Sequence, residues 1–550
     1  MVSFAAPITI RVATTDIIRT DIGQATFGSG VEFRTSELRW TASTPTLGDT
    51  TALTADTMKW LKLGSLRFPN GTSSLHYAAE QPEWSYYECP NPPKAASDQC
   101  PNPAATCSCT HYGNQWDSFL TPTEITSFTD NRFDMQRLFQ VNTWLSAKGK
   151  SWFDFVQDSN GGLNATALDA AARKASAWVA RDGGRTRYWE IGNEDWARWN
   201  ATQHAQIAEA FRSKMLDPNL NGGRKPLLMV QGLAADYNGN KPADWYAALT
   251  SKLPQDSSRK ISSIYGYSVH QYITAKDYPD ALSEEERRRN QTSDMFATVE
   301  ANRPVNGVKT ILGIGTANSP TRDWKVWMTE FNVDQPAAKD SRGAAIPETL
   351  QDVGHALVIA DWTGKMLESN VERLFMHSLD HHQDYALVQY ANDGSKINSP
   401  VVTAPGFAYA IYPQEFGQTM VRTLYANNPS IPSADKHSSY PQVSAYSSIK
   451  DGKELRIIVV NRSLQNKAYV NINTATAPGQ RWLASGKFGF RELRSRTNTI
   501  HESNRISRGY TKDNISWSPV AQYNQYVTGI ENVELAPASA NLFIMPLQVP

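Results

Sequence analysis

The most constraining feature of the sequence is a regular alternation of short apolar runs and helical patterns between about residues 52 and 420. With a first run near 23–33, eight of these runs have the length and flanking turn residues of β-strands. Strands separated by helices of roughly 10–20 residues pair in parallel, and eight such units close a (β/α)8 barrel. The other seven runs are 65–69, 137–144, 187–194, 226–233, 264–272, 325–333 and 373–379.

The predicted helices lie between these strands and support the same fold class, α/β with a (β/α)8 TIM barrel. An open doubly wound sheet is the alternative, but no Gly-x-Gly-x-x-Gly motif follows any of the strands. The helical patterns are at 54–64, 122–133, 164–182, 204–216, 243–253, 283–303 and 347–367.

After about residue 421 the pattern becomes all-β. Residues 440–463 read as two alternating strands joined by a turn at Asp451 and Gly452, and 467–473 and 539–547 are further strands. This predicts a C-terminal β-sandwich, which the strand-like segment 8–15 is expected to join. The predicted division is 1–20 for that strand, 21–420 for the catalytic barrel with a Cys-rich insert at about 78–118, and 421–550 for the sandwich.

Four cysteines, Cys89, Cys100, Cys107 and Cys109, lie in a segment rich in Pro, Asn, Ala and Ser. Disulfides would stabilise such an irregular loop by restricting its unfolded states. A zinc site is the alternative, but the spacing matches no common zinc motif. Disulfides imply an oxidising compartment, so we expect a secreted or periplasmic protein.

Charge and composition restrict the partners. Lys and Arg together number 54, as do Asp and Glu, which argues against nucleic acid or an anionic membrane. No apolar run approaches the roughly 20 residues of a membrane helix, and the first residues lack the pattern of a signal peptide, which we expect to be absent or removed. The 16 Trp and 22 Tyr suit a carbohydrate ligand or a large aromatic core.

Two glutamates stand at the predicted carboxyl ends of strands, where barrel enzymes carry their active sites. Glu194 follows Asn193 at the end of the fourth strand or at the first loop position, and Glu330 ends the seventh strand, shortly before Asn332. Hydrolysis of a glycosidic bond needs two carboxyl groups, one to protonate the leaving oxygen and one to attack the anomeric carbon or activate water. Each glutamate alone is compatible with a structural salt bridge, but the pair favours catalysis.

Other strand ends supply supporting groups. Arg67 ends the second strand, where a guanidinium can hold a carboxylate ionised and lower its pKa, or form a structural ion pair. Asn142 ends the third strand, and His270 and Tyr272 end the sixth. His270 is equally compatible with a buried structural role.

Two further features surround these positions. Glu190 lies within the fourth strand and is expected to serve the internal charge network of the barrel, whereas Trp196 and Trp199 are expected on the loop over the mouth, where a sugar ring can stack. After the eighth strand come His377, Asp380, His381 and His382, a cluster that raises a metal-dependent hydrolase as an alternative.

Other chemistries lack their motifs. The chain has no His-x-x-Glu-His spacing, no Gly-x-Ser-x-Gly elbow and no phosphate-binding loop. We therefore expect neither a metal nor a cofactor.

The motif set resembles clan A of the glycoside hydrolases, and within it family 51, the α-L-arabinofuranosidases. The stretch WEIGNE at 189–194 matches a motif of that family, RFPNG at 67–71 is similar to its Arg-Tyr-Pro-Gly-Gly, and His270 and Tyr272 match its His-x-Tyr. The resemblance spans about residues 20–550, although it is thin outside these motifs. It implies Glu194 as acid/base, Glu330 as nucleophile and Asn193 as a ligand of the sugar 2-hydroxyl.

The resemblance also implies that Arg67 and Tyr272 contact Glu330. The sequence departs from the family at Phe68, which replaces Tyr, and at Asn70, which replaces Gly. The stretch TEFN at 329–332 is also similar to families 39 and 79, the β-xylosidases and β-glucuronidases.

These features predict a retaining glycoside hydrolase, an exo-acting enzyme like an α-L-arabinofuranosidase on plant or microbial polysaccharide. The alternatives are another clan A glycosidase, such as a β-xylosidase, β-glucuronidase, galactofuranosidase or endo-glycanase, and a non-catalytic carbohydrate-binding barrel. The expected partner is an oligo- or polysaccharide, and the sequence leaves the oligomeric state open.

Overall fold

The computed structural model describes most of the barrel strands and sandwich, together with the helices between them. The described residues are 6–30, 59–68, 136–141, 162–197, 199–253, 264–279, 281–301, 325–334, 338–339, 345–346, 352–379, 385–392, 397–475, 481–484, 490–494, 517–521, 525–527 and 529–548. None of the helices in these ranges is both long and apolar enough to cross a membrane.

Eight parallel strands close into a barrel, in the order β11-β2-β3-β4-β5-β6-β7-β8. This confirms all eight predicted strands. Their apolar runs were a usable signal because parallel barrel strands are buried on both faces. The strands are β2 (Phe27–Gly30), β3 (Ser65–Phe68), β4 (Gln136–Val141), β5 (Tyr188–Ile191), β6 (Leu227–Gln231), β7 (Ile264–Thr274), β8 (Lys325–Asp334) and β11 (Arg373–Met376).

Most of the helices begin where a polar side chain caps the first turn. Asn164 and Asp352 accept hydrogen bonds from the backbone N–H of the third helical residue of α3 and α8. Asn200 and Ser283 form capping boxes with Gln203 and Glu286. The bounds are α3 (Ala165–Asp182), α4 (Ala201–Met215), α5 (Pro242–Lys252), α6 (Glu284–Glu300), α8 (Val353–Glu368) and α9 (Ala404–Glu415).

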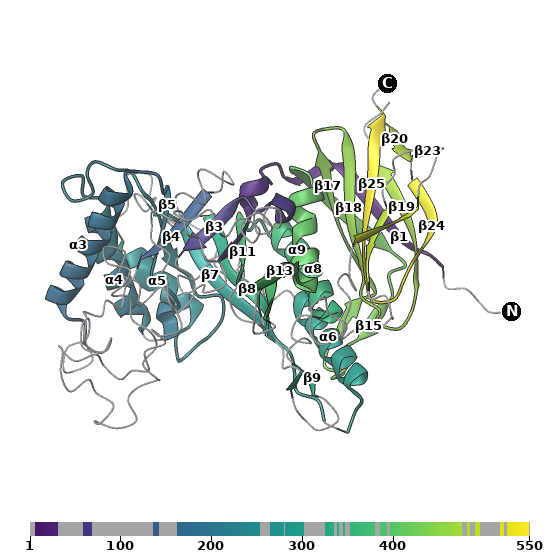
Figure 1. Ribbon diagram of the computed structural model, residues 1–550, viewed down its shortest axis with the longest axis horizontal. Coiled ribbons are helices and arrows are strands. Elements are labelled where there is room, and N and C mark those ends of the chain that lie inside the picture. The colour runs from purple at the N-terminus through teal and green to yellow at the C-terminus, as the bar shows by residue number, and fades with distance from the viewer. Residues whose placement is uncertain are drawn as a thin grey trace.

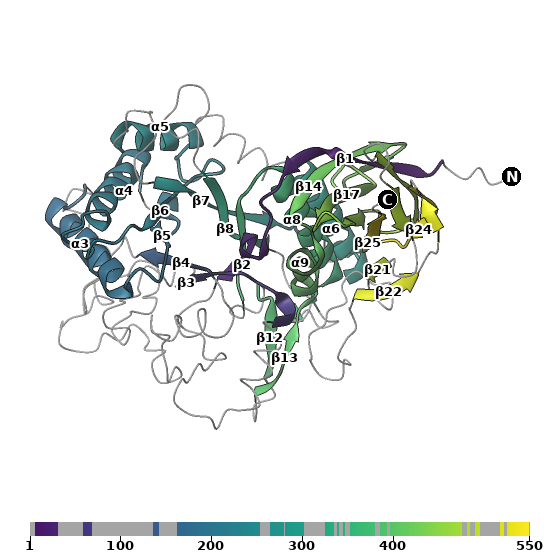
Figure 2. The same cartoon turned by 90° about the horizontal axis from the view of Figure 1, so that it is seen from above.

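Five of the predicted helices correspond to α3, α4, α5, α6 and α8. Of the helix predicted at 54–64, residues 59–61 are described as helical, and the one predicted at 122–133 lies outside the described residues. Helix α9 was not predicted from the sequence. Figures 1 and 2 show α3, α4 and α5 on the side of the barrel away from the sandwich, and α6, α8 and α9 between the barrel strands and the sandwich.

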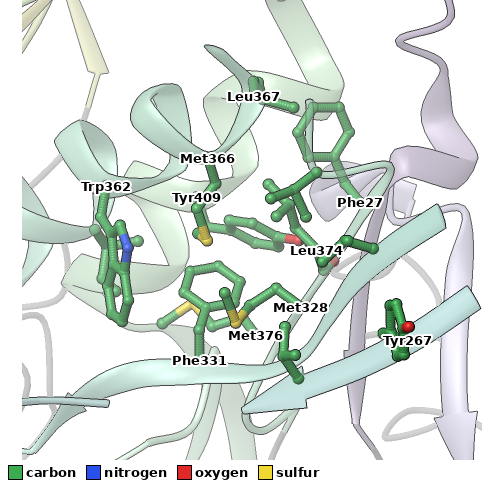
Figure 3. Close-up of a cluster of buried hydrophobic side chains, with 14 of the residues drawn as sticks. Phe27, Tyr267, Met328, Phe331, Trp362, Met366, Leu367, Leu374, Met376 and Tyr409 are labelled. Atoms are coloured by element: carbon green, nitrogen blue, oxygen red, sulfur yellow. Dashed lines mark hydrogen bonds between the residues drawn. The ribbon is translucent and has the colours of Figure 1, made fainter. Parts of the chain in front are cut away.

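The main hydrophobic core lies between the barrel strands and the surrounding helices. Figure 3 shows Phe331 of β8 between Trp362 of α8 and Tyr409 of α9. The Phe331 ring meets both at edge-on angles, with centroids 5.5 Å and 5.7 Å away. The Tyr409 hydroxyl also donates to the carbonyl of Leu374 at 2.7 Å, which attaches α9 to the barrel wall.

Large side chains fill the barrel interior near the amino ends of the strands. The Arg373 guanidinium stacks over the rings of Tyr188 and Trp327, at 4.6 Å and 4.4 Å from their centroids. The same buried cluster contains Leu138, Met229 and Phe375. Because this half of the barrel is packed, the polar interior positions lie toward the carboxyl ends.

The C-terminal residues form an eleven-stranded sheet, mostly antiparallel, as predicted for the sandwich. The N-terminal strand β1 (Ile8–Arg19) joins it, antiparallel to β14 (Thr419–Ala426) and parallel to β19 (Ala468–Ala475). The predicted hairpin is β17 (Val443–Lys450) with β18 (Glu454–Asn461), and Asp451 and Gly452 both have positive φ in its turn. The remaining strands are β20 (Arg481–Ala484), β21 (Phe490–Leu493), β22 (Trp517–Ala521), β23 (Gln525–Val527), β24 (Gly529–Leu535) and β25 (Ser539–Gln548).

Three short ribbons complete the described strands, and the sequence did not predict them. They are β9 (Ala338–Lys339) with β10 (Ala345–Ile346), β12 (Val388–Asn392) with β13 (Ile397–Val402), and β15 (Ser430–Pro432) with β16 (Ser439–Pro441). The domain limits 1–20, 21–420 and 421–550 remain proposals.

A buried ion pair joins the barrel to the sandwich. Asp361 of α8 and Arg462, which follows β18, are both fully buried, and their side chains meet at 2.8 Å. The hydroxyls of Ser444 and Tyr446 donate to the same carboxylate at 2.5 Å and 2.7 Å. The Asp361 carboxylate thus satisfies three donors from the sandwich side.

Removing this carboxylate should destabilise the protein strongly. Asp361→Ala leaves two buried hydroxyls without their acceptor and removes the buried partner of Arg462, which keeps only its contact with the partly exposed Glu300. We expect the free energy of unfolding in a urea titration to fall by about 3–5 kcal/mol. Asp16→Ala is the matched control, because the Asp16–Arg422 pair is half-exposed and should contribute less than about 1 kcal/mol. Equal losses in the two variants would contradict the prediction.

Candidate active site

A β-bulge in β8 turns two consecutive side chains toward the barrel axis. The pairing of β8 with β7 shifts between Val269 and His270, and its pairing with β11 shifts between Leu374 and Met376. Both shifts insert one residue on β8 at Thr329, so that Thr329 and Glu330 both face inward. β8 then continues to Asp334 beside β7, so Glu330 lies within the strand, and the prediction that it ends the strand is wrong.

Arg67, at the carboxyl end of β3, is the central cation of the barrel mouth. It is fully buried, and its Nε donates to Glu190 Oε2 at 2.6 Å while Nη1 contacts Glu330 Oε1. Burial opposes the charge of Arg67, but the charges of Glu190 and Glu330 outweigh it and raise the pKa of the guanidinium. One guanidinium is therefore shared between two carboxylates.

Glu190 belongs to an internal polar network, as predicted. Its side chain is fully buried, and its Oε1 accepts from Gln231 Nε2 at 2.8 Å and from Thr329 Oγ1 at 3.1 Å. Together with the bond from Arg67 these contacts satisfy both oxygens of the carboxylate. Glu190 thus fixes the orientation of Arg67 from the side opposite Glu330.

Glu194 is held in a backbone conformation that few residues other than glycine adopt. Its φ is +49°, and that of Gly192 is +84°. The backbone N–H of Glu194 donates to Gln231 Oε1 at 3.2 Å, and its carboxylate lies 3.2 Å from His270 Nδ1. With 29% of its side chain exposed, Glu194 is the more accessible of the two predicted catalytic acids, since the exposed fraction of Glu330 is 4%.

Three side chains surround Glu330 in addition to Arg67. Tyr272 donates its hydroxyl to Oε2 at 2.8 Å, and the Nδ1 atoms of His270 and His377 lie 3.5 Å and 3.9 Å from the same oxygen. Burial raises the pKa of Glu330, but the charges of His270, Arg67 and His377 outweigh it, so the pKa lies well below its usual range. Glu330 is therefore ionised.

Tyr272 keeps its proton at the same place. Burial and then the negative charges of Glu330 and Glu194 raise the pKa of its hydroxyl well above the usual value. The phenol therefore remains a hydrogen-bond donor to Glu330.

The amide side chains of Asn193 and Gln140 each have one polar atom that forms no hydrogen bond with the described residues. Asn193 accepts with Oδ1 from Arg67 Nη2 at 3.0 Å and from Gln140 Nε2 at 2.7 Å. Its Nδ2 and Gln140 Oε1 are buried without a hydrogen-bond partner among the described residues. One buried donor and one buried acceptor thus remain unpaired within the part of the chain that the structure describes.

Comparison with curated proteins gives partial matches. No model of a protein family matches the chain. A probable α-L-arabinofuranosidase C from Aspergillus terreus is 27% identical over 189 residues, which is 32% of this chain and 32% of that protein. A probable α-L-arabinofuranosidase C from Aspergillus niger is 26% identical over 187 residues, again 32% of each. The match therefore spans about a third of the length of these relatives.

The fold is that of the family 51 α-L-arabinofuranosidases. The arabinose complex of the enzyme from Thermotoga maritima aligns with a TM-score of 0.64 at 14% identity, over 98% of this chain and 100% of that chain. A family 51 enzyme from Bifidobacterium longum aligns with a TM-score of 0.65 at 13% identity, over 98% and 99%. The predicted resemblance is confirmed, and at these identities it establishes the barrel and sandwich.

A related architecture occurs in a second family. A family 44 xyloglucanase from Paenibacillus polymyxa aligns with a TM-score of 0.54 at 12% identity, over 98% of this chain and 100% of that chain.

Within this arabinofuranosidase-like fold, Trp196 and Trp199 occupy different environments. Trp196 is partly buried and meets the ring of Tyr237 edge-on, with centroids 4.3 Å apart. Trp199 is only 1% exposed and packs in the core, so the expectation that it stacks on a sugar is wrong. It anchors the loop instead, with its backbone N–H bonded to the carbonyl of Asp195 at 2.8 Å.

Asn332 is buried within the rim of the site. Its Nδ2 donates to the carbonyls of His377 and Tyr385, and its Oδ1 lies 2.6 Å from His355 Nε2. It therefore supports the segment after β11. The other predicted residues, Asn70, Asn142, Asp380, His381, His382, Cys89, Cys100, Cys107 and Cys109, lie outside the described residues.

Sequence reasoning missed several polar residues of the mouth. Gln231 ends β6 and Gln140 lies near the end of β4, so each stands at a strand end, a signal that could have found it. Tyr385 follows β11, with its ring 5.6 Å from those of both Tyr272 and His377. Thr329 had no such signal, because it faces inward only through the bulge.

Glu194, His270 and Glu330 also form a group that could hold a metal ion, since one potential ligand atom of each lies within 4.8 Å of the others. Arg67 contacts Glu330 and lies 3.2 Å from His270 Nε2. A guanidinium at this distance already neutralises the carboxylate and repels a second cation, so the geometry favours an ion-paired site without metal.

Gly192 should tolerate no side chain. A Cβ there would lie 2.3 Å from Asp195 Oδ2, so Gly192→Ala combines an unfavourable φ with a steric clash. Gly183→Ala is the control, because its φ is +72° and a Cβ meets nothing within 4 Å. We expect thermal unfolding to show a loss of about 1 kcal/mol for Gly183→Ala and at least about 2 kcal/mol more for Gly192→Ala. Equal losses would show that Asp195 does not pack against Gly192.

Proposed function

We propose that the chain is a retaining glycoside hydrolase in which Glu330 is the nucleophile and Glu194 the acid/base. The observation that carries the proposal is the distance between the two acids, because a carboxylate oxygen of each lies within 4.8 Å of the other. Retaining glycosidases hold their carboxyl groups roughly 5–5.5 Å apart, whereas inverting enzymes leave roughly 6.5–9.5 Å for a water molecule.

The environment of Glu330 supports its role as nucleophile. Its lowered pKa keeps the carboxylate ionised, and Arg67 and Tyr272 fix its two oxygens. In the first step a Glu330 oxygen forms a bond to the anomeric carbon while the bond to the leaving oxygen breaks. Arg67 and Tyr272 restrain the carboxylate in the attacking orientation.

Glu194 supplies and then removes the proton. Its greater exposure suits a group that faces the leaving oxygen in the first step and water in the second. Glu194 donates its proton to the leaving oxygen, then accepts one from water as that water attacks the glycosyl-enzyme. The sugar is released with its original anomeric configuration, and both carboxyl groups return to their starting states.

The mouth offers groups for the sugar itself. Asn193 Nδ2 can donate and Gln140 Oε1 can accept, since neither has a hydrogen-bond partner among the described residues. The Trp196 ring, which is partly exposed and belongs to the residue two positions after Glu194, provides an apolar surface for a sugar face. We assign these three side chains to the carbohydrate substrate, and His377 and Tyr385 to the wall near Glu330.

The names of the similar proteins favour an α-L-arabinofuranosidase. We propose that this chain acts in the exo mode on plant or microbial polysaccharide. A β-xylosidase, β-glucuronidase, galactofuranosidase or endo-glycanase is the alternative, and the similar xyloglucanase keeps the last of these open. Secretion remains a proposal based on the cysteine cluster.

A screen of nitrophenyl glycosides decides the sugar. We expect α-L-arabinofuranoside to be hydrolysed with the highest kcat/KM among α-L-arabinofuranoside, β-D-xyloside, β-D-galactofuranoside and β-D-glucuronide. Faster hydrolysis of any other member would replace the proposed substrate but leave the two-carboxylate mechanism in place.

Deleting the nucleophile gives the sharpest test of the mechanism. Glu330→Ala should lower kcat by about 10⁴-fold or more, since no covalent intermediate can form. Added azide should restore turnover by attacking the anomeric carbon, and NMR should identify a glycosyl azide of inverted configuration.

The control variant is Glu209→Ala on α4, whose carboxylate pairs with Arg212 on the same helix. It should keep normal kcat. Normal activity in Glu330→Ala, or loss of wild-type activity on adding a chelator, would remove the proposal in favour of another nucleophile or a metal ion.

A further inference from the structure

We propose that Asp195 and His204 form a buried pair that positions Glu194 for proton transfer. This inference rests on the proposed role of Glu194 as acid/base, and it gives a function to two polar side chains outside the group around Glu330. Both residues are fully buried, and Asp195 Oδ2 lies 3.1 Å from His204 Nδ1. Asp195 directly follows Glu194, so any displacement of Asp195 moves the backbone of the acid.

The Asp195 carboxylate packs beneath the turn that carries Glu194. All three carboxylate atoms lie within 2.6 Å of the point where a Gly192 Cβ would be, which is possible only because residue 192 is glycine. Glu194 has a φ of +49°, a conformation that surrounding contacts must maintain. Asp195 provides such a contact on one side of the turn.

A chain of contacts links Asp195 to Gln231, which holds the backbone N–H of Glu194. The ring of His204 stacks on Trp245 with centroids 4.4 Å apart and planes at 17°. The Trp245 indole N–H donates to the Gln231 carbonyl at 2.9 Å, and Gln231 Oε1 accepts the backbone N–H of Glu194 at 3.2 Å. The turn at Glu194 is thus held by Gln231 and by Asp195, and these two residues are linked through His204 and Trp245.

The tautomer of His204 follows from its surroundings. Its Nε2 is buried and has no hydrogen-bond partner among the described residues. An unpaired N–H at this place would cost more than an unpaired ring acceptor, so the proton belongs on Nδ1, where it is donated to Asp195. This bond satisfies a carboxylate that is otherwise expensive to bury.

The consequence is specific to acid catalysis. If the pair positions Glu194, its loss should lower kcat/KM, which reports formation of the glycosyl-enzyme, for substrates whose leaving group needs protonation, and spare kcat/KM for those whose leaving group departs unaided. A purely structural pair would slow both substrates alike, because fewer molecules would be folded. Comparing phenyl and dinitrophenyl glycosides of the same sugar separates the two cases.

His204→Phe is the principal variant, since it keeps a flat ring against Trp245 but removes the donor to Asp195. We expect kcat/KM for the phenyl glycoside to fall roughly 10- to 100-fold, the scale of a small misplacement of a catalytic group. For the dinitrophenyl glycoside we expect kcat/KM to change by less than about threefold. His204→Asn restores an N–H near the Nδ1 position and should recover much of the lost activity.

Two controls make the outcomes distinguishable. Ile207→Val removes a buried methyl group from the same helix and should change the two substrates equally. Glu194→Ala sets the full effect of losing the acid, and an equal loss on both substrates in that variant would overturn the proposed function itself. A strong leaving-group dependence in Glu194→Ala with none in His204→Phe would overturn only the positioning role. If His204→Phe does not fold, Asp195→Asn is assayed in the same way, and the same two outcomes decide.

Discussion

The site depends on one buried guanidinium. Arg67 lies at the point where the packed interior of the barrel gives way to polar side chains, and it has no exposure to solvent. A charge in this place is tolerable only with carboxylate partners, and Arg67 has two, Glu190 and Glu330. Glu190 is fixed in turn by Gln231 and Thr329, so the position of the proposed nucleophile is set by a network rather than by one contact.

The fold places the two acids in opposite environments. Glu330 is buried among cationic and donor groups that keep it ionised, whereas Glu194 extends from a strained turn toward solvent and contacts His270. The rigidity that this requires comes from the packed amino end of the barrel and from the contact between its outer helices and the sandwich. Arg373 and its aromatic neighbours fill the amino end, and the Asp361–Arg462 pair fastens α8 to the sandwich. The proposed active site therefore lies in the polar half of the barrel, and the packed half and the contact with the sandwich stabilise the strands that carry it.

The sequence predicted the eight strands, the sandwich with its N-terminal strand, and the strand ends that carry Arg67, Glu194 and Tyr272, because alternating patterns and strand ends are local signals. It did not predict the bulge at Thr329, which depends on pairing with two neighbouring strands. Trp199 was misplaced for a similar reason, since its burial in the main core depends on the packing of the folded chain. The contact between Asp195 and His204 also needed the folded turn at Gly192 before it could be seen.

The most direct test of the account is the anomeric configuration of the sugar at the moment of its release, followed by proton NMR during hydrolysis of an aryl glycoside. Double displacement through Glu330 predicts that the first product formed has the same configuration as the substrate, with the other anomer appearing only later by mutarotation. First formation of the inverted anomer would contradict the account, because it requires a water molecule between carboxyl groups that lie within 4.8 Å of each other.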